Sequence, residues 1–284
     1  MSDKLTVQDI QGLKGKRKIT MLTAYDYPMA HAVECAGIDM ILVGDSLVNV
    51  VLGLDSTKGV TMDQMIYHAG AARRGAPHTF LIGDMPFEAY QTDVRKSAEN
   101  AARFVREAGC DAVKLEWFDR ALEAAERVIR EGIPVMGHVG LTPQTADQLG
   151  GFKVQGKDAS AARALIRQAG DFEKAGCFAV LLECVPDRVA RLVTETLAVP
   201  TIGIGAGPFC DGQVLVTHDM LGLFERYKPR FVKAYARMSQ DMVKAFEAFK
   251  AEVLNGKFPA DEHIFKIKDE EFKGIRRTEG EEAS

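Results

Sequence analysis

The chain has 284 residues, of which 46% are hydrophobic and 27% charged, and its formal net charge at pH 7 is −4. Its 36 basic and 40 acidic residues form no long Lys/Arg stripe interleaved with aromatic residues, so we expect no nucleic-acid partner. The N-terminus has no apolar leader segment, and no apolar run approaches the ~20 residues of a membrane span, so we expect a cytoplasmic protein without a membrane partner.

Short runs rich in Val, Ile and Leu recur along the chain and predict buried strands. Seven lie at 19–25, 39–45, 79–84, 112–116, 134–140, 178–183 and 200–207, and a less regular eighth lies at 213–219. Segments with helical periodicity lie between most of them, at 61–74, 94–108, 119–131, 160–175 and 186–198. Apolar strands that alternate with helices indicate a parallel sheet covered on its outside. Eight such strands predict an α/β fold of the (β/α)8 TIM-barrel type.

A weak internal repeat supports this alternation. Residues 33–45, 104–116 and 171–183 each contain a helical stretch that ends near Ala-Gly, followed by an apolar run and a carboxylate. Glycine at a helix C-terminus supplies the left-handed residue that turns the chain into the next strand. An open doubly wound sheet is the alternative, but the turn after the first strand, TAYDYP at 23–28, has no glycine-rich fingerprint.

The two ends of the chain depart from the strand and helix pattern. A Lys/Glu-rich amphipathic helix is expected over 231–253, and residues 268–284 are so rich in charge that we expect disorder there. We therefore predict one catalytic barrel domain over 1–267 and a tail over 268–284. Two long loops, 46–60 and 140–159, follow the second and fifth strands and are predicted to form walls of a site at the strand C-termini.

Five consecutive predicted strands end on polar side chains. They are Asp45, Asp84, Glu116, His138 and Glu183. Carboxylates collected around one rim repel each other unless a cation lies among them. Oxygen ligands without a Cys or His cluster favour Mg2+, so we assign Asp45, Asp84 and Glu116 to a magnesium site. The alternative is that these carboxylates cap helices or pair with arginines such as Arg73 and Arg120.

Further residues near these strand ends are candidates for substrate binding and catalysis. Lys114 lies two residues before Glu116 and so faces the same side of its strand, where it is either neutralised by the carboxylates or, as we favour, binds a substrate carboxylate. Ser46 can donate a hydrogen bond to the same ligand or cap its loop. Glu183 follows the apolar run AVLL, which would raise its pKa and suit a general base. His138 can bond a ligand oxygen or serve as a structural donor.

Other motifs carry less information. GIGAG at 203–207 lacks the spacing of a dinucleotide-binding fingerprint and also fits close approach of backbone to a bulky group. The GDSL string at 44–47 is similar to an esterase nucleophile block, but no D-x-x-H block accompanies it. The five cysteines form no C-x-x-C pair, so we expect reduced thiols in place of a disulfide or zinc framework.

The sequence resembles the ketopantoate hydroxymethyltransferase family over residues 5–267. The matching strings include LTAYDYP (22–28), VGDSL (43–47), GDMPF (83–87), VKLE (113–116), GHVGLTPQ (137–144), GGFKVQG (150–156), LLECVP (181–186) and IGIGAGPFCDGQVLV (202–216). Trp117 and Lys58-Gly59 depart from the residues expected at their positions. Both departures lie beside the predicted site, so they leave its chemistry intact and put only loop geometry in question.

The resemblance implies a barrel of the phosphoenolpyruvate mutase/isocitrate lyase type. It implies transfer of a hydroxymethyl group from 5,10-methylenetetrahydrofolate to 3-methyl-2-oxobutanoate, giving 2-dehydropantoate in pantothenate biosynthesis. Carried over by position, Asp45, Asp84 and Glu116 would hold Mg2+, the last through water. Asp45, Ser46, Asp84 and Lys114 would contact the keto acid, and Glu183 would accept its proton. A homo-oligomer, often a decamer, is implied as well.

Two other functions remain open at this point. A related Mg-dependent α-keto-acid lyase or mutase would share the carboxylates of the rim, but the sequence shows no cysteine-containing motif of that group. A catalytically silent barrel that serves as an oligomeric scaffold would show no dependence on a metal.

Overall fold

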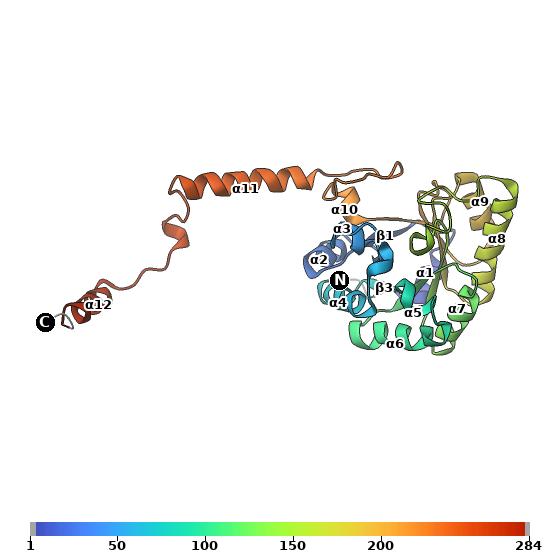
Figure 1. Cartoon of the computed structure of the whole chain (residues 1–284), viewed down its shortest axis with the longest axis horizontal. Coiled ribbons are helices and arrows are strands. Elements are labelled where there is room, and N and C mark those ends of the chain that lie inside the picture. Colours follow the sequence, from blue (N-terminus) through green and yellow to red (C-terminus); the bar gives the residue numbers. More distant parts are fainter. Residues whose placement is uncertain (1–3, 282–284) are drawn as a thin grey trace. The chain divides into compact units, whose positions relative to one another are not determined.

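The computed structural model describes residues 4–281, and the chain divides into two compact units, Met1–Ala236 and Arg237–Ser284. In the first unit eight parallel strands form a closed barrel in sequence order (Figure 1). The strands are β1 Ile19–Thr23, β2 Met40–Val43, β3 Phe80–Asp84, β4 Ala112–Glu116, β5 Val135–Gly140, β6 Ala179–Glu183, β7 Thr201–Ile204 and β8 Gly212–Leu215. The predicted barrel is confirmed, and the doubly wound alternative is excluded because β1 pairs with β8.

Helices surround the barrel. They are α1 Val7–Gly12, α2 Tyr27–Cys35, α3 Leu47–Val50, α4 Met62–Gly75, α5 Phe87–Tyr90, α6 Ser97–Ala108, α7 Ala121–Arg130, α8 Ala159–Lys174, α9 Asp187–Thr196 and α10 Thr217–Met220. Three 3-10 turns accompany them: η1 Thr57–Gly59, η2 Val94–Lys96 and η3 Pro143–Thr145. The five predicted helices correspond to α4, α6 with η2, α7, α8 and α9, which Figure 1 shows on the outside of the strands. Among the described residues, no helix is both long and apolar enough to cross a membrane.

The helix-to-strand turns follow the predicted use of glycine. Gly109 ends α6 in the left-handed conformation with a φ of 70°. Gly37 and Gly176 have φ values of 70° and 97° before β2 and β6. Because these backbone angles are unfavourable for residues with a Cβ, glycine at these turns directs three helices into their following strands.

The eighth strand is shorter than predicted. The run expected over 213–219 is strand only to Leu215, and Thr217 begins α10. The Thr217 N–H donates to Oγ1 of Thr23 at 3.0 Å, and its hydroxyl donates to the Thr23 carbonyl. These bonds to the end of β1 turn the chain away from the sheet, so residues 217–219 lie at the rim of the barrel.

Two layers of apolar side chains make the core. One fills the barrel interior, where Ile10 of α1 joins Met21, Met40 and Phe80. The other lies between the strands and the outer helices. At two points a strand glycine makes room for a helix aromatic: a Cβ at Gly83 would lie 2.5 Å from the ring of Phe104. A Cβ at Gly137 would lie 2.5 Å from the ring of Phe172.

The second unit consists of α11 Met238–Leu254, η4 Asp261–His263 and α12 Asp269–Glu281. The helix expected over 231–253 therefore begins later, because the Tyr235 N–H donates to the Met220 carbonyl at 2.7 Å and holds that stretch extended. No residue of α11 is buried, and the division between the two compact units falls after Ala236.

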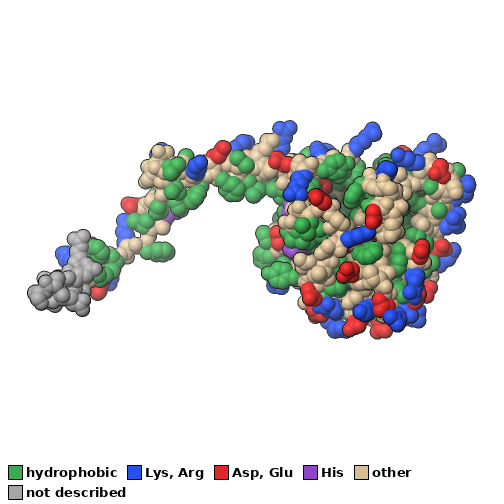
Figure 2. Space-filling view, viewed as in Figure 1, with side chains coloured by type: hydrophobic (Ala, Val, Ile, Leu, Met, Phe, Trp, Pro, Cys, Tyr) green, Lys and Arg blue, Asp and Glu red, His purple; other side chains and the backbone are tan. Residues whose placement is uncertain are grey.

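The tail also differs from its expected disorder over 268–284. Residues 269–281 are helical, with three acidic residues in the first turn, where they complement the positive end of the helix dipole. Residues 282–284 lie outside the described residues. Figure 2 shows hydrophobic side chains gathered along the second unit and charges of both signs interspersed on the visible face of the first.

The packing of Phe104 on Gly83 predicts a substitution effect. Gly83→Ala places a methyl group inside the ring and should lower the free energy of unfolding by about 1–3 kcal/mol. Urea denaturation measures the change, with Gly12→Ala as control because its Cβ would meet open space. In the double variant with Phe104→Leu the two costs should sum to less than their separate values. A Gly83→Ala protein as stable as the parent would contradict this packing.

Candidate functional site

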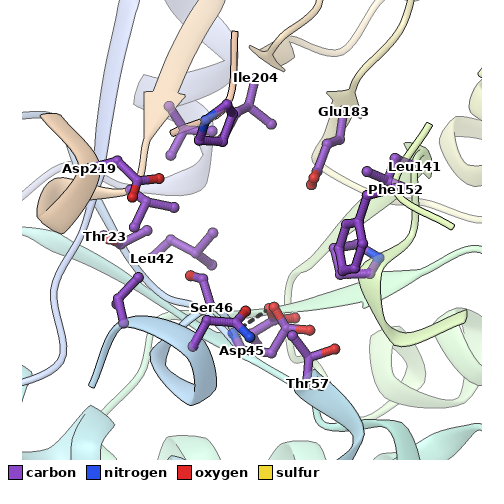
Figure 3. A pocket seen from close by; sticks show the side chains of 18 of the residues that line it. Thr23, Leu42, Asp45, Ser46, Thr57, Leu141, Phe152, Glu183, Ile204 and Asp219 are labelled. Atoms are coloured by element: carbon purple, nitrogen blue, oxygen red, sulfur yellow. Dashed lines mark hydrogen bonds between the residues drawn. The ribbon is translucent and has the colours of Figure 1, made fainter. Parts of the chain in front are cut away.

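A cavity of about 510 Å3 opens at the C-terminal ends of the strands (Figure 3). Its lining comes from β1 to β8 and from the loops after β2, β5 and β8. The two long loops predicted as walls contribute residues such as Leu54 and Phe152. Of the five strand-end side chains, Asp45, Asp84, His138 and Glu183 line this cavity, and Glu116 is buried directly beside it.

The ends of β2 and β3 hold two carboxylates against each other. The Asp45 N–H donates to Oδ2 of Asp84 at 3.0 Å, which fixes the turn after β2. Oδ2 of Asp45 is buried and receives no hydrogen bond from the described residues. Next to it, Oγ of Ser46 lies 2.8 Å from the hydroxyl of Tyr25. Ser46 is the residue before α3 but makes no side-chain cap to that helix, which leaves its hydroxyl directed to the cavity region.

Lys114 is the buried cation of the site. Its Nζ lies 2.8 Å from Oδ1 of Asp84 and 3.8 Å from Oε1 of Glu116, and its side chain is 4% exposed. Burial opposes the charge, but the carboxylates of Asp84, Glu116 and Asp45 outweigh burial and raise the lysine pKa. The lysine is therefore charged and already paired with the carboxylates, and because it lines the cavity it can still meet an anionic ligand.

The carboxylate of Glu116 accepts a hydrogen bond through only one of its two oxygens. Its Oε2 accepts the Gln144 N–H at 3.1 Å, and its own N–H donates to the hydroxyl of Tyr90 at 3.0 Å. Tyr90 in turn donates to Oε1 of Gln144 at 2.9 Å. Oε1 of Glu116 is buried without a hydrogen bond from the described residues. Burial, followed by the nearby carboxylates, raises the Glu116 pKa well above its ordinary value despite Lys114.

The donor set fits a hard divalent cation. Asp45 and Glu116 each present a buried oxygen that lacks a hydrogen bond, Oδ1 of Asp84 has only the Lys114 ammonium beside it at 2.8 Å, and this one ammonium serves all three carboxylates. No three Asp, Glu, His or Cys side chains in residues 4–281 converge as a ready-made metal cage. Mg2+ does not need one, because it is usually held by one or two carboxylates and completed by water and substrate oxygens. The arrangement suits a cation that binds together with an oxygen-rich ligand.

His138 connects the lysine to the far side of the cavity. Lys114 Nζ lies 3.2 Å from its Nδ1 and donates to it, which leaves the ring proton on Nε2. Nε2 lies 3.4 Å from Oε2 of Glu183. Burial, and then the charge of Lys114, lowers the His138 pKa well below its ordinary value, so the ring is neutral. The Nε2 donor makes no hydrogen bond within the described residues and faces Glu183, so it is available to that carboxylate or to a ligand oxygen.

Glu183 ends β6 in an apolar setting, as predicted. Its side chain keeps 17% exposure, and Figure 3 shows its carboxylate directed into the cavity. Burial raises its pKa to about 7, with Lys114 opposing the shift. A carboxyl group with a pKa near neutrality is suited to proton transfer.

The backbone around Glu183 is closely specified. Cys184 has a φ of 49°, the one left-handed residue other than glycine among those described, and its N–H donates to the Ile204 carbonyl. On the β5 side, a Cβ at Gly140 would lie 2.3 Å from the Glu183 carbonyl oxygen. The strained backbone at Cys184 and the close approach of Gly140 therefore both constrain Glu183, whose carboxylate enters the cavity.

The structure brings together all the residues selected from the sequence. The helix-capping and arginine-pairing alternatives do not apply, since Arg73 pairs with Asp111 and Arg120 with Glu123. No local sequence pattern marks Tyr90 and Gln144, which orient Glu116. In GIGAG the close-approach interpretation applies: a Cβ at Gly205 would lie 2.7 Å from the ring of Phe231, so that glycine accommodates a side chain. All five cysteines are free, although Cys35 is exposed.

Comparisons with known proteins give a consistent result. The family model described as ketopantoate hydroxymethyltransferase matches residues 4–261. A relative in Syntrophomonas wolfei, named 3-methyl-2-oxobutanoate hydroxymethyltransferase, is 53% identical over 257 residues, which is 90% of this chain and 93% of that protein. One in Syntrophobacter fumaroxidans with the same name is 50% identical over 275 residues, covering 97% of this chain and 98% of the relative.

Solved structures resemble the chain in fold. Phosphoenolpyruvate phosphomutase from Streptomyces platensis matches with a TM-score of 0.61 at 14% identity, covering 98% of each chain. 2,3-dimethylmalate lyase, a member of the phosphoenolpyruvate mutase/isocitrate lyase superfamily, matches with a TM-score of 0.58 at 15% identity, covering 96% of this chain and 99% of its own. The predicted barrel type is confirmed.

The raised pKa of Glu183 predicts how stability depends on pH. Above pH 7 the folded protein holds Glu183 as a poorly solvated anion, and as pH falls through 7 the folded state binds a proton that the unfolded chain, with a pKa near 4.5, does not. This group should therefore make the metal-free protein about 1 kcal/mol less stable at pH 8 than at pH 6.

Urea denaturation in EDTA at the two pH values measures this difference. Glu183→Gln should remove that 1 kcal/mol of pH dependence, whereas Glu88→Gln, at an exposed glutamate on α5, should retain it. An equal pH dependence in the parent and in Glu183→Gln would contradict the desolvated state of Glu183.

Proposed function

The chain belongs to the ketopantoate hydroxymethyltransferase family, and on this premise we propose that it transfers a hydroxymethyl group from 5,10-methylenetetrahydrofolate to 3-methyl-2-oxobutanoate, giving 2-dehydropantoate. The hydroxymethyltransferase activity itself follows from relatives that share half of its residues over nearly the whole chain. The one-carbon donor, the metal and the residue roles are our proposal. One observation carries it: Glu183 faces a cavity that also contains Asp45, Asp84 and Lys114.

The metal site is proposed at Asp45 and Asp84, with Glu116 acting through water. Mg2+ bound there would draw electron density from the keto and carboxylate oxygens of the substrate and make its C3–H more acidic. The buried oxygens of Asp45 and Glu116, which lack hydrogen bonds, and the Asp84 oxygen that only Lys114 contacts support this assignment.

The protein's own residues then position the keto acid. Lys114 contributes a charged ammonium to the substrate carboxylate, and Ser46 contributes a hydroxyl that Tyr25 orients from 2.8 Å. These groups are on β4 and the loop after β2, so they hold one end of the substrate while its C3 is directed toward β6. Fixed donors of this kind lower the barrier because they are already in place when charge develops.

Glu183 is the proposed general base. As a carboxylate it removes the C3 proton, whose bonding electrons remain on the substrate as an enolate, and the enolate carbon then forms a C–C bond to the methylene carbon of the donor. Over the whole transfer both bonds from that carbon to the folate nitrogens break, water supplies the hydroxyl oxygen, and the C3 proton and one water proton end on the two nitrogens of tetrahydrofolate. A pKa of about 7 suits this transfer at neutral pH. His138, whose Nε2 lies 3.4 Å from the carboxylate, holds Glu183 in orientation.

The other functions receive less support. The lyase or mutase alternative rests on fold similarity at 13–16% identity, which does not specify a reaction. A catalytically silent scaffold would not require a buried lysine among three carboxylates, and such an arrangement lowers the stability of the fold.

We also propose that the protein is a cytoplasmic homo-oligomer, a decamer by the family resemblance. In its second unit, α11 exposes Met242, Val243, Phe246 and Phe249. A large apolar face of this kind on one helix is typical of surfaces that become covered on assembly, which supports association between copies of the chain.

The role of Glu183 is testable through exchange of the keto-acid C3 proton in deuterated water without folate. Glu183→Gln should slow exchange by about 10²- to 10⁴-fold while keto-acid binding, followed by calorimetry with Mg2+ present, stays within about twofold. Glu88→Gln is the matched control and should exchange like the parent. Rapid exchange in Glu183→Gln would identify a different base.

A further inference from the structure

A further carboxylate, Asp219, enters the cavity from the side of β8, apart from Glu183 on β6. Asp219 lies on α10, just after β8, and Figure 3 shows its side chain directed into the cavity from the side of β8, whereas Glu183 enters from β6. Within residues 4–281 no side chain or backbone group donates a hydrogen bond to its carboxylate or pairs with it in the structure. Burial alone raises its pKa to about 6. The mechanism above gives this carboxylate no task.

Apolar and aromatic side chains line the same cavity as Asp219, and Phe224 is tied to its neighbour His218 through the backbone. Phe224 and Phe231, both from the segment after α10, line the cavity together with Leu54 from the loop after β2. Phe231 is fixed in place, because its ring packs on Gly205, where a Cβ would lie 2.7 Å away and φ is 63°. A flat ligand can therefore stack in this part of the cavity with one edge toward the carboxylate.

A cation lies at the outer edge of the same wall. Arg226 donates from Nη1 to the Gly53 carbonyl at 2.7 Å, and the same atom lies 3.7 Å from Oδ1 of Asp55. Its side chain is 63% exposed and also lines the cavity. This cavity thus has a half-buried acceptor, aromatic lining and an exposed guanidinium.

We propose that this region binds the reduced-folate donor, with Asp219 accepting hydrogen bonds from N3–H and the 2-amino group of the pterin ring. This inference rests on the proposed function. It assigns the recognition of the second substrate to residues separate from those that hold the keto acid.

The chemistry of the two partners matches. A pterin has apolar faces for stacking, and one edge carries two adjacent N–H donors at the spacing of a carboxylate's two oxygens. A half-buried carboxylate without a protein donor gains most from a ligand that supplies two. The glutamate carboxylates of a folate suit the guanidinium of Arg226. A cavity of about 510 Å3 is within the range that buries such a ligand, and a five-carbon keto acid alone does not need that volume.

The residue assignment can be tested with tetrahydrofolate as the probe. Calorimetry should show that Asp219→Asn binds it about 10- to 100-fold more weakly than the parent, because the amide offers one acceptor and a donor that opposes the pterin N–H groups. In turnover, the KM for methylenetetrahydrofolate should rise while the KM for the keto acid stays within about twofold. Asp63→Asn, an 82% exposed aspartate on α4, is the matched control and should bind the probe like the parent.

A ligand change gives the same test without relying on the variant's folding. A tetrahydrofolate analogue that lacks the 2-amino group should bind the parent about 10-fold more weakly than tetrahydrofolate does, and Asp219→Asn should scarcely distinguish the two ligands. Equal affinity of parent and Asp219→Asn for tetrahydrofolate, in a parent that turns over, would overturn this inference alone. A parent that neither binds tetrahydrofolate nor turns over methylenetetrahydrofolate would overturn the proposed donor as well.

Discussion

Three buried carboxylates surround one buried ammonium at the rim of this barrel. The rest of the site depends on this excess of negative charge. Asp84 and Glu116 lie 2.8 and 3.8 Å from Lys114, while one oxygen of each of Asp45 and Glu116 is buried without a hydrogen bond from a described residue. Such an arrangement costs folding free energy, since burial raises the pKa of Asp84 and Glu116 against the attraction of Lys114. A divalent cation and an anionic ligand that bind together would resolve both the charge and the missing contacts.

The barrel holds these groups by their backbones and by residues behind them. The Gln144 N–H fixes one oxygen of Glu116, Tyr90 accepts the Glu116 backbone N–H, and the Asp45 N–H fixes one oxygen of Asp84. The other oxygen of Glu116 remains for a ligand, and the other oxygen of Asp84 faces Lys114. On the opposite side, the left-handed Cys184 and the close approach at Gly140 determine where the Glu183 carboxylate emerges. The strands and the residues behind them therefore orient the carboxylate side chains. The charged atoms of these side chains face the cavity, where substrates would bind.

The sequence predicted the central features of this arrangement because they depend on simple periodicities. Apolar runs that end on Asp45, Asp84, Glu116, His138 and Glu183 place five polar side chains at one end of any parallel barrel. Asp219 ends the predicted eighth run, 213–219, but it was given no role, because that run was the least regular; in the structure the strand stops at Leu215, and the bonds between Thr217 and Thr23 place Asp219 on α10. The roles of Tyr90 and Gln144 depend on contacts 26 and 28 residues distant from Glu116, which no local pattern reports.

The central claim is that the rim carboxylates form a cation site that is completed by the keto acid. Electron paramagnetic resonance of Mn2+, used in place of Mg2+, measures free cation directly in a titration of the protein with and without 3-methyl-2-oxobutanoate. We predict that the keto acid tightens Mn2+ binding and that Asp84→Asn weakens the ternary complex by at least about 10-fold, while Asp63→Asn does not. Mn2+ affinity that is unchanged by the keto acid and by Asp84→Asn would contradict the account.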